Sequence, residues 1–440
     1  MSNKLSDIVN FNPSRILKKG TVAPFIEMAS LPTNTKFIKQ IDEKPFSGGS
    51  KFKNGDTLFA RITPCLENGK TGKVTNLKDE IIGHGSTEFI VMSAKEPEFD
   101  EDYIYYFARL PEFREFAQQR MVGTSGRQRV AWQDLADFEF IFPPKEQRKK
   151  AAALLNIYDQ KIDLNTQINQ TLEQIAQALF KSWFVDFDPV RAKVQALSDG
   201  LSLEQAELAA IQAISGKTPE ELTALSQTQP ERYAELAETA KAFPCEMVEI
   251  DGIEVPKGWE VKVLDEIANY QNGLALQKFR PEDDEPFLPV VKIAQLRQGY
   301  ADGEEKAKAS IKPECIIDNG DVIFSWSGSL LVDIWCGGKA ALNQHLFKVT
   351  SKRYPKWFYY FYTKYHLAEF QRIAYDKAVT MGHIKREHLS AAKCIVPNDE
   401  LLANKSLENI LEKIIFNRLE NFNLQNTRDL LLPKLLNGEI

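Results

Sequence analysis

The feature that most constrains this chain is an internal duplication. At an offset of 265 residues, the segment NGDTLFAR from Asn54 aligns with NGDVIFSW from Asn319. At an offset of 254, the YYF triplet from Tyr105 aligns with the YYF triplet from Tyr359. One length change of 11 residues therefore aligns nearly the whole chain with itself. Self-similarity on this scale predicts two copies of one fold rather than one large core.

Each copy has the pattern of a mixed α/β globular piece. Stretches typical of strands recur at 57–62 and 88–94, and again at 322–326 and 346–351. Aromatic residues at helical spacing predict one helix in each copy, at 102–121 and 356–374. A short Gly-containing loop and a closing strand follow each of these helices. The 440 residues provide enough length for more than one such piece.

One long amphipathic helix follows each globular piece. Residues 146–185 contain no Gly or Pro, and their apolar residues recur at spacings of three and four. Residues 400–440 repeat the pattern, and polar residues interrupt both apolar seams, as Asn165 and Asn421 do. Two helices of this kind favour antiparallel pairing with each other, in which the polar positions select the register.

These features predict an α+β fold with two duplicated α/β domains. Two long antiparallel, coiled-coil-like helices separate the domains in a pseudo-twofold arrangement. We expect a first domain at 1–145, a first helix at 146–185, an extended acidic connector with some helix at 186–255, a second domain at 256–399 and a second helix at 400–440.

The charge is unevenly distributed. The net charge of −6 argues against a nucleic-acid partner, but residues 186–255 alone carry 14 acidic and 5 basic side chains. The other 370 residues sum to +3. This asymmetry indicates basic surfaces joined by an acidic connector, although ordinary solvated surface would explain the charges equally well.

The composition is that of an ordinary globular protein, with 43% hydrophobic and 26% charged residues. No apolar run approaches the roughly 18 residues of a membrane span. The N-terminus lacks a secretory signal, and the five cysteines are far apart and odd in number. We therefore expect a cytoplasmic location with no membrane partner.

Motifs for catalysis are not encoded. Two GKT triplets, at 69–71 and 216–218, lack the first glycine of a phosphate-binding loop, where Pro64 and Ile211 stand instead. No CxxC pair, HExxH motif or Cys/His cluster has zinc spacing, and the acidic run at 282–285 is best explained as a solvated loop. We expect a binding protein with no catalytic residue, no metal site and no cofactor of its own.

Basic and polar residues near two Gly-containing loops are the candidate ligand-binding residues. Basic side chains on such loops can approach a phosphate backbone, and Arg can read guanine edges. In the first copy the candidates are Arg61, Lys70, Lys73, Arg120, Thr124, Ser125, Arg127 and Arg129. In the second copy they are Trp326, His345, Lys377, Thr380, His383, Lys385 and Arg386.

Several segments, in this order and duplicated, resemble the specificity subunit of type I restriction-modification enzymes. The first helix ends in FKSWF and the second in LLLPKLLNG. PKGW opens the second half, both halves contain the NGD strand, and GTSGRQRVAWQDLADFEFIFPP precedes the first helix. The resemblance covers essentially the whole chain.

The resemblance implies that each domain is a target recognition domain that reads one half of a split, asymmetric sequence on double-stranded DNA. It implies as partners two modification subunits and the restriction subunits, to which the methyl donor, ATP and Mg²⁺ belong. The helices would set the spacer and dock the modification subunits. The expected docking residues are Leu155, Ile162, Leu172, Leu179, Phe180, Trp183, Leu407, Leu411, Ile414, Leu432 and Leu435.

Two other hypotheses stay open. The chain could be a coiled-coil scaffold whose two globular halves bind proteins, or a self-contained enzyme. Methylation directed to one two-part motif would favour DNA recognition over the scaffold. Binding of the methyl donor or ATP by the purified chain would favour the enzyme.

Overall fold

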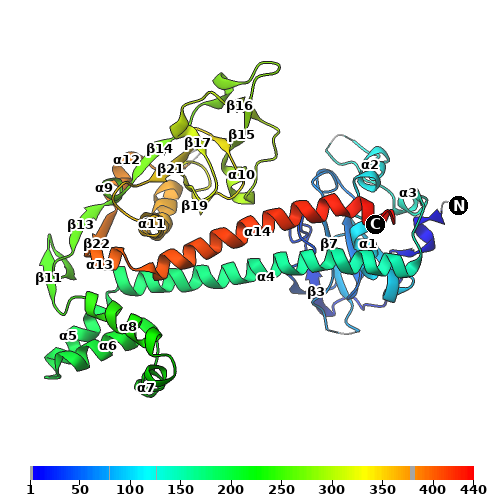
Figure 1. Ribbon diagram of the computed structural model, residues 1–440. Coiled ribbons are helices and arrows are strands. Elements are labelled where there is room, and N and C mark those ends of the chain that lie inside the picture. The colour runs from blue at the N-terminus through cyan, green and yellow to red at the C-terminus, as the bar shows by residue number, and fades with distance from the viewer. Residues whose placement is uncertain (1–2, 79, 125, 377–381) are drawn as a thin grey trace. The chain divides into compact units, whose positions relative to one another are not determined.

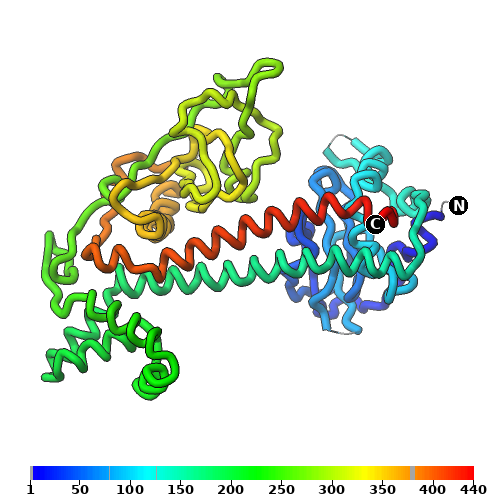
Figure 2. The backbone as a smooth tube through the Cα atoms, in the orientation of Figure 1, coloured from blue at the N-terminus to red at the C-terminus, as the bar shows by residue number. Residues whose placement is uncertain are grey.

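A computed structural model describes residues 3–78, 80–124, 126–376 and 382–440. The chain divides into two compact units, Met1–Gln167 with Glu420–Ile440 and Ile168–Leu419. Two long helices, α4 (Lys145–Phe184) and α14 (Lys405–Leu436), contribute residues to both units (Figure 1). Figure 2 follows each of these helices as one unbroken tube.

The N-domain, which contains strands β1 to β10, consists of three small sheets and short helices. Its sheet orders are β2-β9-β6-β7, β4-β3-β8-β5 and β1-β10. The strands are β1 (Asn3–Lys4), β2 (Val9–Phe11), β3 (Val22–Ile26), β4 (Asp42–Pro45), β5 (Ser50–Phe52), β6 (Thr57–Ala60), β7 (Thr71–Lys73), β8 (Gly83–Gly85), β9 (Phe89–Ala94) and β10 (Glu139–Phe140). The helices are α1 (Pro97–Phe107), α2 (Pro111–Gln119) and α3 (Trp132–Ala136).

The C-domain, which contains strands β13 to β22, repeats this topology strand for strand. Its sheet orders are β14-β21-β18-β19, β16-β15-β20-β17 and β13-β22. The strands are β13 (Glu260–Val263), β14 (Asn269–Asn272), β15 (Phe287–Val291), β16 (Lys306–Lys308), β17 (Ile316–Ile317), β18 (Val322–Ser325), β19 (Leu331–Ile334), β20 (Ala340–Leu342), β21 (Leu346–Thr350) and β22 (Lys393–Val396). The helices are α9 (Leu264–Ile267), α10 (Ile293–Gln298), α11 (Lys356–Asp376), α12 (Arg386–Leu389) and α13 (Asp399–Leu402). The predicted duplication is therefore confirmed at the level of sheet topology.

The repeated NGD segment makes the same turn in both domains. Gly55 and Gly320 both have φ of +88°, a left-handed conformation that glycine adopts without a Cβ clash. Asp56 accepts a hydrogen bond from the backbone N–H of Lys53 at 2.7 Å, and Asp321 accepts one from that of Asp318 at 2.7 Å. The turn delivers the chain into β6 and β18, whose residues are all buried.

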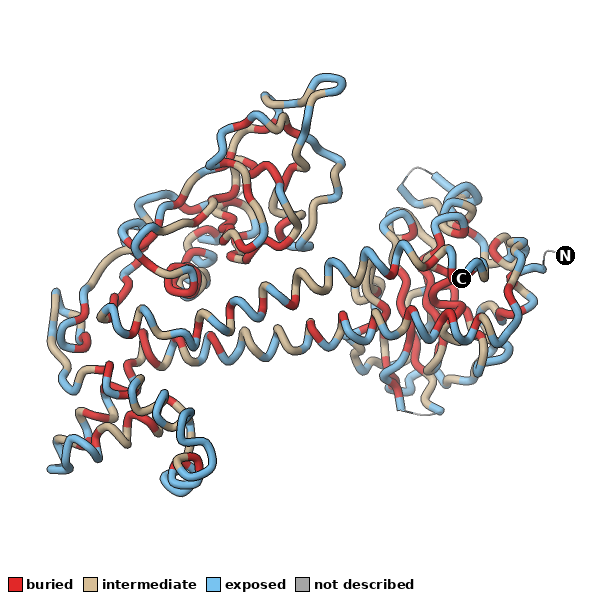
Figure 3. Tube along the Cα trace, in the orientation of Figure 1, coloured by how far each residue is buried: buried red, intermediate tan, exposed pale blue. Residues whose placement is uncertain are grey.

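The predicted aromatic helices differ between the copies. The stretch 102–121 is divided between α1 and α2, because Pro111 begins a new helix and removes a backbone donor at that point. The stretch 356–374 forms the single helix α11. The aromatic residues of both stretches are mostly buried. Figure 3 colours the backbone trace of the chain by residue burial.

Polar residues of α4 and α14 bond to one another within each unit. In the first unit, Asn165 donates to Asn421 Oδ1 at 2.9 Å, and buried Arg428 pairs with buried Asp159. In the second unit, Asn417 donates to Asn169 Oδ1 at 2.8 Å. Residue numbers rise on one helix as they fall on the other, so the predicted antiparallel pairing is confirmed within each unit.

The acidic connector is a packed helical insert rather than an extended link. Residues 188–242 form α5 (Asp188–Ser198), α6 (Leu203–Ser215), α7 (Pro219–Thr228) and α8 (Pro230–Ala242), and the hairpin β11 (Met247–Ile250) with β12 (Ile253–Pro256) follows. Capping boxes at Ser202 and Thr218 start α6 and α7. The insert shares one core with the C-domain, in which Phe243 packs on Trp183 and Trp259. The predicted helix within this connector is confirmed, but the prediction that the connector is extended was wrong, because the Leu and Ala residues of this acidic segment bury their side chains.

Candidate nucleic-acid interface

The first candidate loop, residues 121–130, is a hairpin anchored on the end of β6. Val122 and Arg129 form a bridge, and Ile62 forms another with Arg129. The backbone N–H of Thr63 donates to the Gln128 carbonyl at 3.0 Å, and that of Val130 donates to the Arg61 carbonyl at 3.0 Å. The loop tip at 123–127 is therefore held on the rigid sheet by both of its ends.

An ion cluster lies at the base of this loop. Arg129 donates from Nε to both carboxylate oxygens of Glu88 at 2.9 Å, and from Nη2 to Oε1 at 2.7 Å. The Nε of Arg61 lies 3.6 Å from the same carboxylate. The Glu88 carboxylate raises the pKa of Arg129 by this bonding. Arg129 is thus oriented by a carboxylate that the sequence analysis did not single out, and Arg61 lies beside the same group.

The loop tip carries a cation without such a partner. Arg127 is exposed, and within the described residues its guanidinium forms no ion pair. Exposed Arg120 rests on the ring of Phe116, with 3.4 Å between the guanidinium carbon and the ring centroid. Thr124 is exposed, while Ser125 lies outside the described residues. Of the loop residues, Arg127 is the one best placed to meet a phosphate.

Lys73 is not available to a ligand. Its side chain is buried at 4% exposure in β7, where its ammonium pairs with Asp102 and with Glu101 at 2.8 Å. The prediction of a DNA contact for Lys73 was therefore wrong, since the cation neutralises carboxylates of α1. Lys70 is half-buried and donates to the carbonyls of Met28 at 2.7 Å and Ala29 at 3.3 Å, so its ammonium is already engaged.

The second candidate loop is anchored by the same backbone bonds at equivalent positions. Ser327 bridges to His383 as Ile62 does to Arg129. The N–H of Gly328 donates to the Gly382 carbonyl at 2.9 Å, and that of Ile384 donates to the Trp326 carbonyl at 3.0 Å. Lys377 and Thr380 lie outside the described residues. Residues 128–130 and 382–384 are therefore anchored at the same point of the repeated fold.

Aromatic side chains occupy the base of the second loop, where the first loop has charged side chains. The centroid of Trp326 lies 5.9 Å from that of His345 and 6.4 Å from that of His383. The ring centroid of Phe347 lies 5.8 Å from that of Trp326. These predicted residues therefore come together as an aromatic cluster. Trp326 is uncharged, whereas Arg61 at the equivalent position of the N-domain is a cation.

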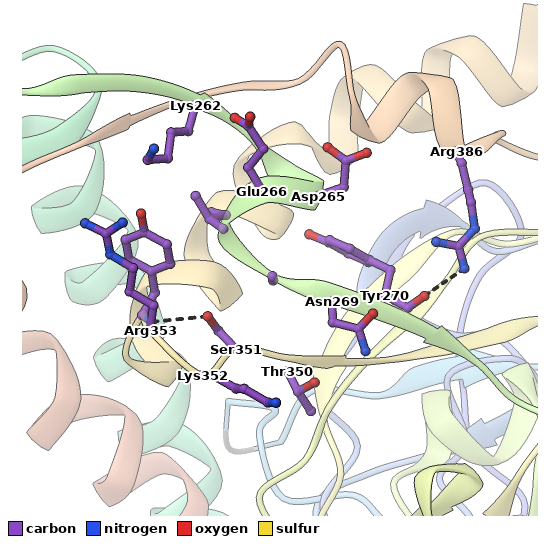
Figure 4. A pocket seen from close by; sticks show the side chains of 13 residues that line it. Lys262, Asp265, Glu266, Asn269, Tyr270, Thr350, Ser351, Lys352, Arg353 and Arg386 are labelled. Atoms are coloured by element: carbon purple, nitrogen blue, oxygen red, sulfur yellow. Dashed lines mark hydrogen bonds between the residues drawn. The ribbon is translucent and has the colours of Figure 1, made fainter.

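Lys385 and Arg386 begin α12 beside this cluster. Lys385 is exposed and lies 3.6 Å from Glu387, a distance that leaves it weakly paired. Arg386 donates to the Tyr270 carbonyl at 3.0 Å, along the edge of a hollow that Figure 4 shows. Both signs of charge line this hollow, including Asp265 and Glu266. Arg386 thus pins α12 to β14, and Lys385 is the freer cation.

The predicted docking residues are largely buried within the chain itself. Leu172 and Leu179 are half-buried, and the other nine are buried: Leu155, Ile162, Phe180, Trp183, Leu407, Leu411, Ile414, Leu432 and Leu435. A side chain in the core of its own unit has no surface for a partner, so the docking prediction was wrong for these nine. The outer face of α4 instead exposes Leu154 at 40%, Ile157 at 61% and Leu164 at 51%.

The GKT triplets have structural roles. Gly216 is the left-handed C-cap of α6 and Thr218 is the N-cap of α7. Thr71 of the first triplet is buried in β7. Within the described ranges, no cluster of three or more His, Cys, Asp or Glu side chains is placed to hold a metal ion. Across those same ranges, no helix is long and apolar enough to cross a membrane.

Comparisons with known proteins identify relatives of this chain. The chain matches the type I restriction modification DNA specificity domain twice, over residues 2–174 and 256–429. It is 38% identical over 430 residues to the type I restriction enzyme HindI specificity subunit of Haemophilus influenzae, covering 92% of each chain. It is 24% identical to the MjaIX specificity subunit of Methanocaldococcus jannaschii, covering 77% of this chain and 69% of the relative. The crystal structure of an S subunit from M. genitalium is similar at 13% identity and a TM-score of 0.47, covering 99% of this chain and 96% of the other.

Proposed function

The chain belongs to the family of type I restriction-modification DNA specificity subunits, and from this membership we propose how it selects its target. The N-domain reads one half of a split sequence on double-stranded DNA, and the C-domain reads the other half. The observation that carries the proposal is the pair of loops, which are anchored at the same point of two topologically identical domains but present different side chains. Equivalent scaffolds with unlike contact residues suit an asymmetric target.

Exposed cations on and beside the two loops supply the contacts in this proposal. Arg127 lies on the first loop and Lys385 lies at the start of α12, just after the second, and each would release counterions on meeting a phosphate. Residues at the loop bases would meet base edges. Phosphate contacts would position each domain, and base contacts would specify the sequence.

The chain acts without catalysis in this proposal. Two modification subunits supply the methyl transfer with its methyl donor, and restriction subunits supply ATP- and Mg²⁺-dependent cleavage. The half-exposed apolar stripe of Leu154, Ile157 and Leu164 is the proposed dock for a modification subunit, because burial of such side chains favours association. The complex would work in the cytoplasm, where its DNA lies, and there the five free cysteines stay reduced. The scaffold hypothesis is not favoured, since the family match covers both globular halves.

The test is the methylation pattern that the chain directs. The full-length chain is expressed with its modification subunit in a host that lacks other adenine methylation, and methylated adenines are mapped by single-molecule sequencing. We expect one motif with two specified halves and an unspecified spacer. Methylation without a motif, or a motif that does not depend on this chain, would contradict the proposal.

A further inference from the structure

We infer that Arg61 selects a guanine in the half-site read by the N-domain, that Glu88 and Arg129 position it, and that the C-domain lacks this contact because Trp326 stands at the equivalent place. The inference rests on the proposed function and adds a named specificity residue to it. It is argued from a structural equivalence between three positions in each domain.

The three positions are equivalent by their backbone bonds. The N–H of Arg61 donates to the Glu88 carbonyl at 3.0 Å, and the N–H of Trp326 donates to the His345 carbonyl at 3.4 Å. The N–H of Glu88 is capped by Ser86 Oγ at 3.1 Å, and that of His345 by Asn343 Oδ1 at 3.2 Å.

The third position lies on the anchored loop. Arg129 and His383 are the loop residues that bridge to the strand end, at Ile62 and Ser327 respectively. The same three backbone sites therefore carry Arg61, Glu88 and Arg129 in the N-domain and Trp326, His345 and His383 in the C-domain.

In the N-domain the Glu88 carboxylate is bonded by Arg129 and lies beside Arg61. Arg129 donates from Nε and Nη2 to this carboxylate and from Nη1 to the Arg127 carbonyl at 3.3 Å, which links the loop to the cluster. The Nε of Arg61 lies 3.6 Å from the carboxylate and is buried, with no hydrogen-bond partner among the described residues. Within the described residues, neither Nη atom of Arg61 has a hydrogen-bond partner, and the side chain is 29% exposed. The two Nη atoms of the planar Arg61 guanidinium are therefore available to a ligand.

An oriented fork favours a base edge over a phosphate. A phosphate contact needs only an unneutralised cation, as at Arg127, whereas Arg61 and Arg129 share the charge of one carboxylate. A fixed guanidinium matches the O6 and N7 acceptors of guanine with two parallel hydrogen bonds. Contacts that hold the base-reading side chain in place also keep its geometry productive.

The C-domain cannot make this contact from the same place. Trp326 has one indole N–H, which is buried, and its ring packs against Phe347 and the two histidines. An indole donor cannot bond two acceptors on one base edge. The inferred difference between the two half-sites thus follows from the exchange of Arg61 for Trp326 at one equivalent position.

The test compares methylation motifs of the full complex carrying Arg61→Lys, Glu88→Gln or Trp326→Phe. Arg61→Lys keeps the charge but removes the fork, so we expect discrimination for guanine to fall about tenfold to a hundredfold at one position of one half-site. Glu88→Gln should relax the same position. Trp326→Phe should leave that half unchanged. Arg232→Lys, an exposed residue of α8, is the matched control and should not alter the motif.

The outcomes separate this inference from the proposed function. A wild-type chain that directs no two-part motif would contradict the proposed function. With a two-part motif present, the inference is overturned if neither half contains a G·C pair that depends on Arg61, or if Arg61→Lys leaves stringency unchanged. It is also overturned if methylation by Arg61→Lys falls equally at all sequences while its thermal unfolding matches the wild type, because a uniform loss is the signature of a phosphate contact. If Glu88→Gln proves unstable, Arg61→Lys alone decides.

Discussion

At the residue scale, cations close together in the sequence have opposite roles. Lys73 and Lys70 are occupied by carboxylates or carbonyls of their own domain, and Arg129 is bound by Glu88. Arg127, two residues from Arg129, is exposed and forms no ion pair among the residues that the structure describes. Only a cation with its charge available gains from meeting a phosphate, so binding energy should concentrate at Arg127 and at Lys385, the exposed cation at the start of α12.

Replacement of Arg127 by Ala should weaken DNA binding by the assembled complex to a similar extent for all sequences. Loss of one phosphate contact should also reduce the slope of log affinity against log salt by about 1. The measurement is a titration of labelled DNA at several salt concentrations. Arg232→Ala on α8 removes an equal charge and should leave the slope unchanged. An unchanged slope for Arg127→Ala would remove the phosphate assignment.

At the scale of elements, the helices α4 and α14 combine an apolar seam with buried polar pairs. Asn165 donates to Glu420 at 2.6 Å as well as to Asn421, and Asn421 donates back to the Ile162 carbonyl at 3.2 Å. Asn165 and Asn421 are separated by 256 residues, and the same offset aligns the NQT at 169–171 with the QNT at 425–427. Buried amides that bond only in one alignment disfavour shifted registers.

Asn165→Leu should destabilise the first unit by about 1 to 3 kcal/mol. The substitution removes the side-chain N–H group that donates to the side-chain amide oxygen of Asn421 and to the Glu420 carboxylate. Asn165→Leu combined with Asn421→Leu should recover part of the loss, since two apolar residues can pack where two amides bonded. The measurement is the midpoint of thermal or urea unfolding. Equal destabilisation by the single and double variants would show that the amide pair contributes nothing specific.

Helix length should control the spacer of the DNA target. Removing four residues from α4 and four from α14 shortens each helix by about 6 Å. At about 3.4 Å per base pair, we expect the unspecified spacer to lose one or two base pairs while both half-sites stay the same. The readout is again the methylated motif. A control with Gln170→Ala and Gln174→Ala, both exposed on α4, should keep the spacer. A constant spacer after shortening would contradict the role of the helices as a ruler.

At the scale of the whole molecule, the chain consists of two copies of one domain plus an insert that only one copy carries. The resemblance to type I specificity subunits and the predicted fold class are confirmed by the family match and the sheet topology. The insert α5 to α8 belongs to the second unit and buries Lys193, which donates to the Phe243 carbonyl at 2.6 Å. Its acidic charge lies on the exposed faces of helices whose other faces complete the core.

Replacing residues 188–242 by a short Gly/Ser linker should destabilise the second unit, because Trp183 and Phe243 lose apolar cover. We expect a lower unfolding temperature and a loss of methylation. The control keeps the packing and removes charge, with Glu204→Gln, Glu235→Gln and Glu238→Gln at exposed positions. This control should retain the wild-type motif and unfolding temperature. The opposite pattern would show that the charge of the insert, not its core, is what the protein needs.

The sequence by itself determined the duplication, the strands after the NGD turns and the two long helices. These features depend on local patterns, namely glycine at a left-handed turn, hydrophobic periodicity, and a helix of 40 residues without Gly or Pro. The pairing of the polar seam residues, such as Asn165 and Asn421, could also be predicted from these local patterns. It also explains why the insert was misjudged, since amphipathic short helices reveal their partner faces only when they pack.

Only the tertiary structure decided which candidate residues are available. Whether a lysine is free depends on carboxylates from distant segments: Asp102 and Glu101 reach Lys73 from α1, and Glu88 reaches Arg129 across 41 residues. Most of the apolar seam residues that were expected to dock a partner are likewise buried in the chain's own core. Burial and charge pairing depend on residues that are close in space but distant in the sequence. Residue type and spacing therefore specify the scaffold, whereas the tertiary structure determines which side chains remain available to bind a ligand.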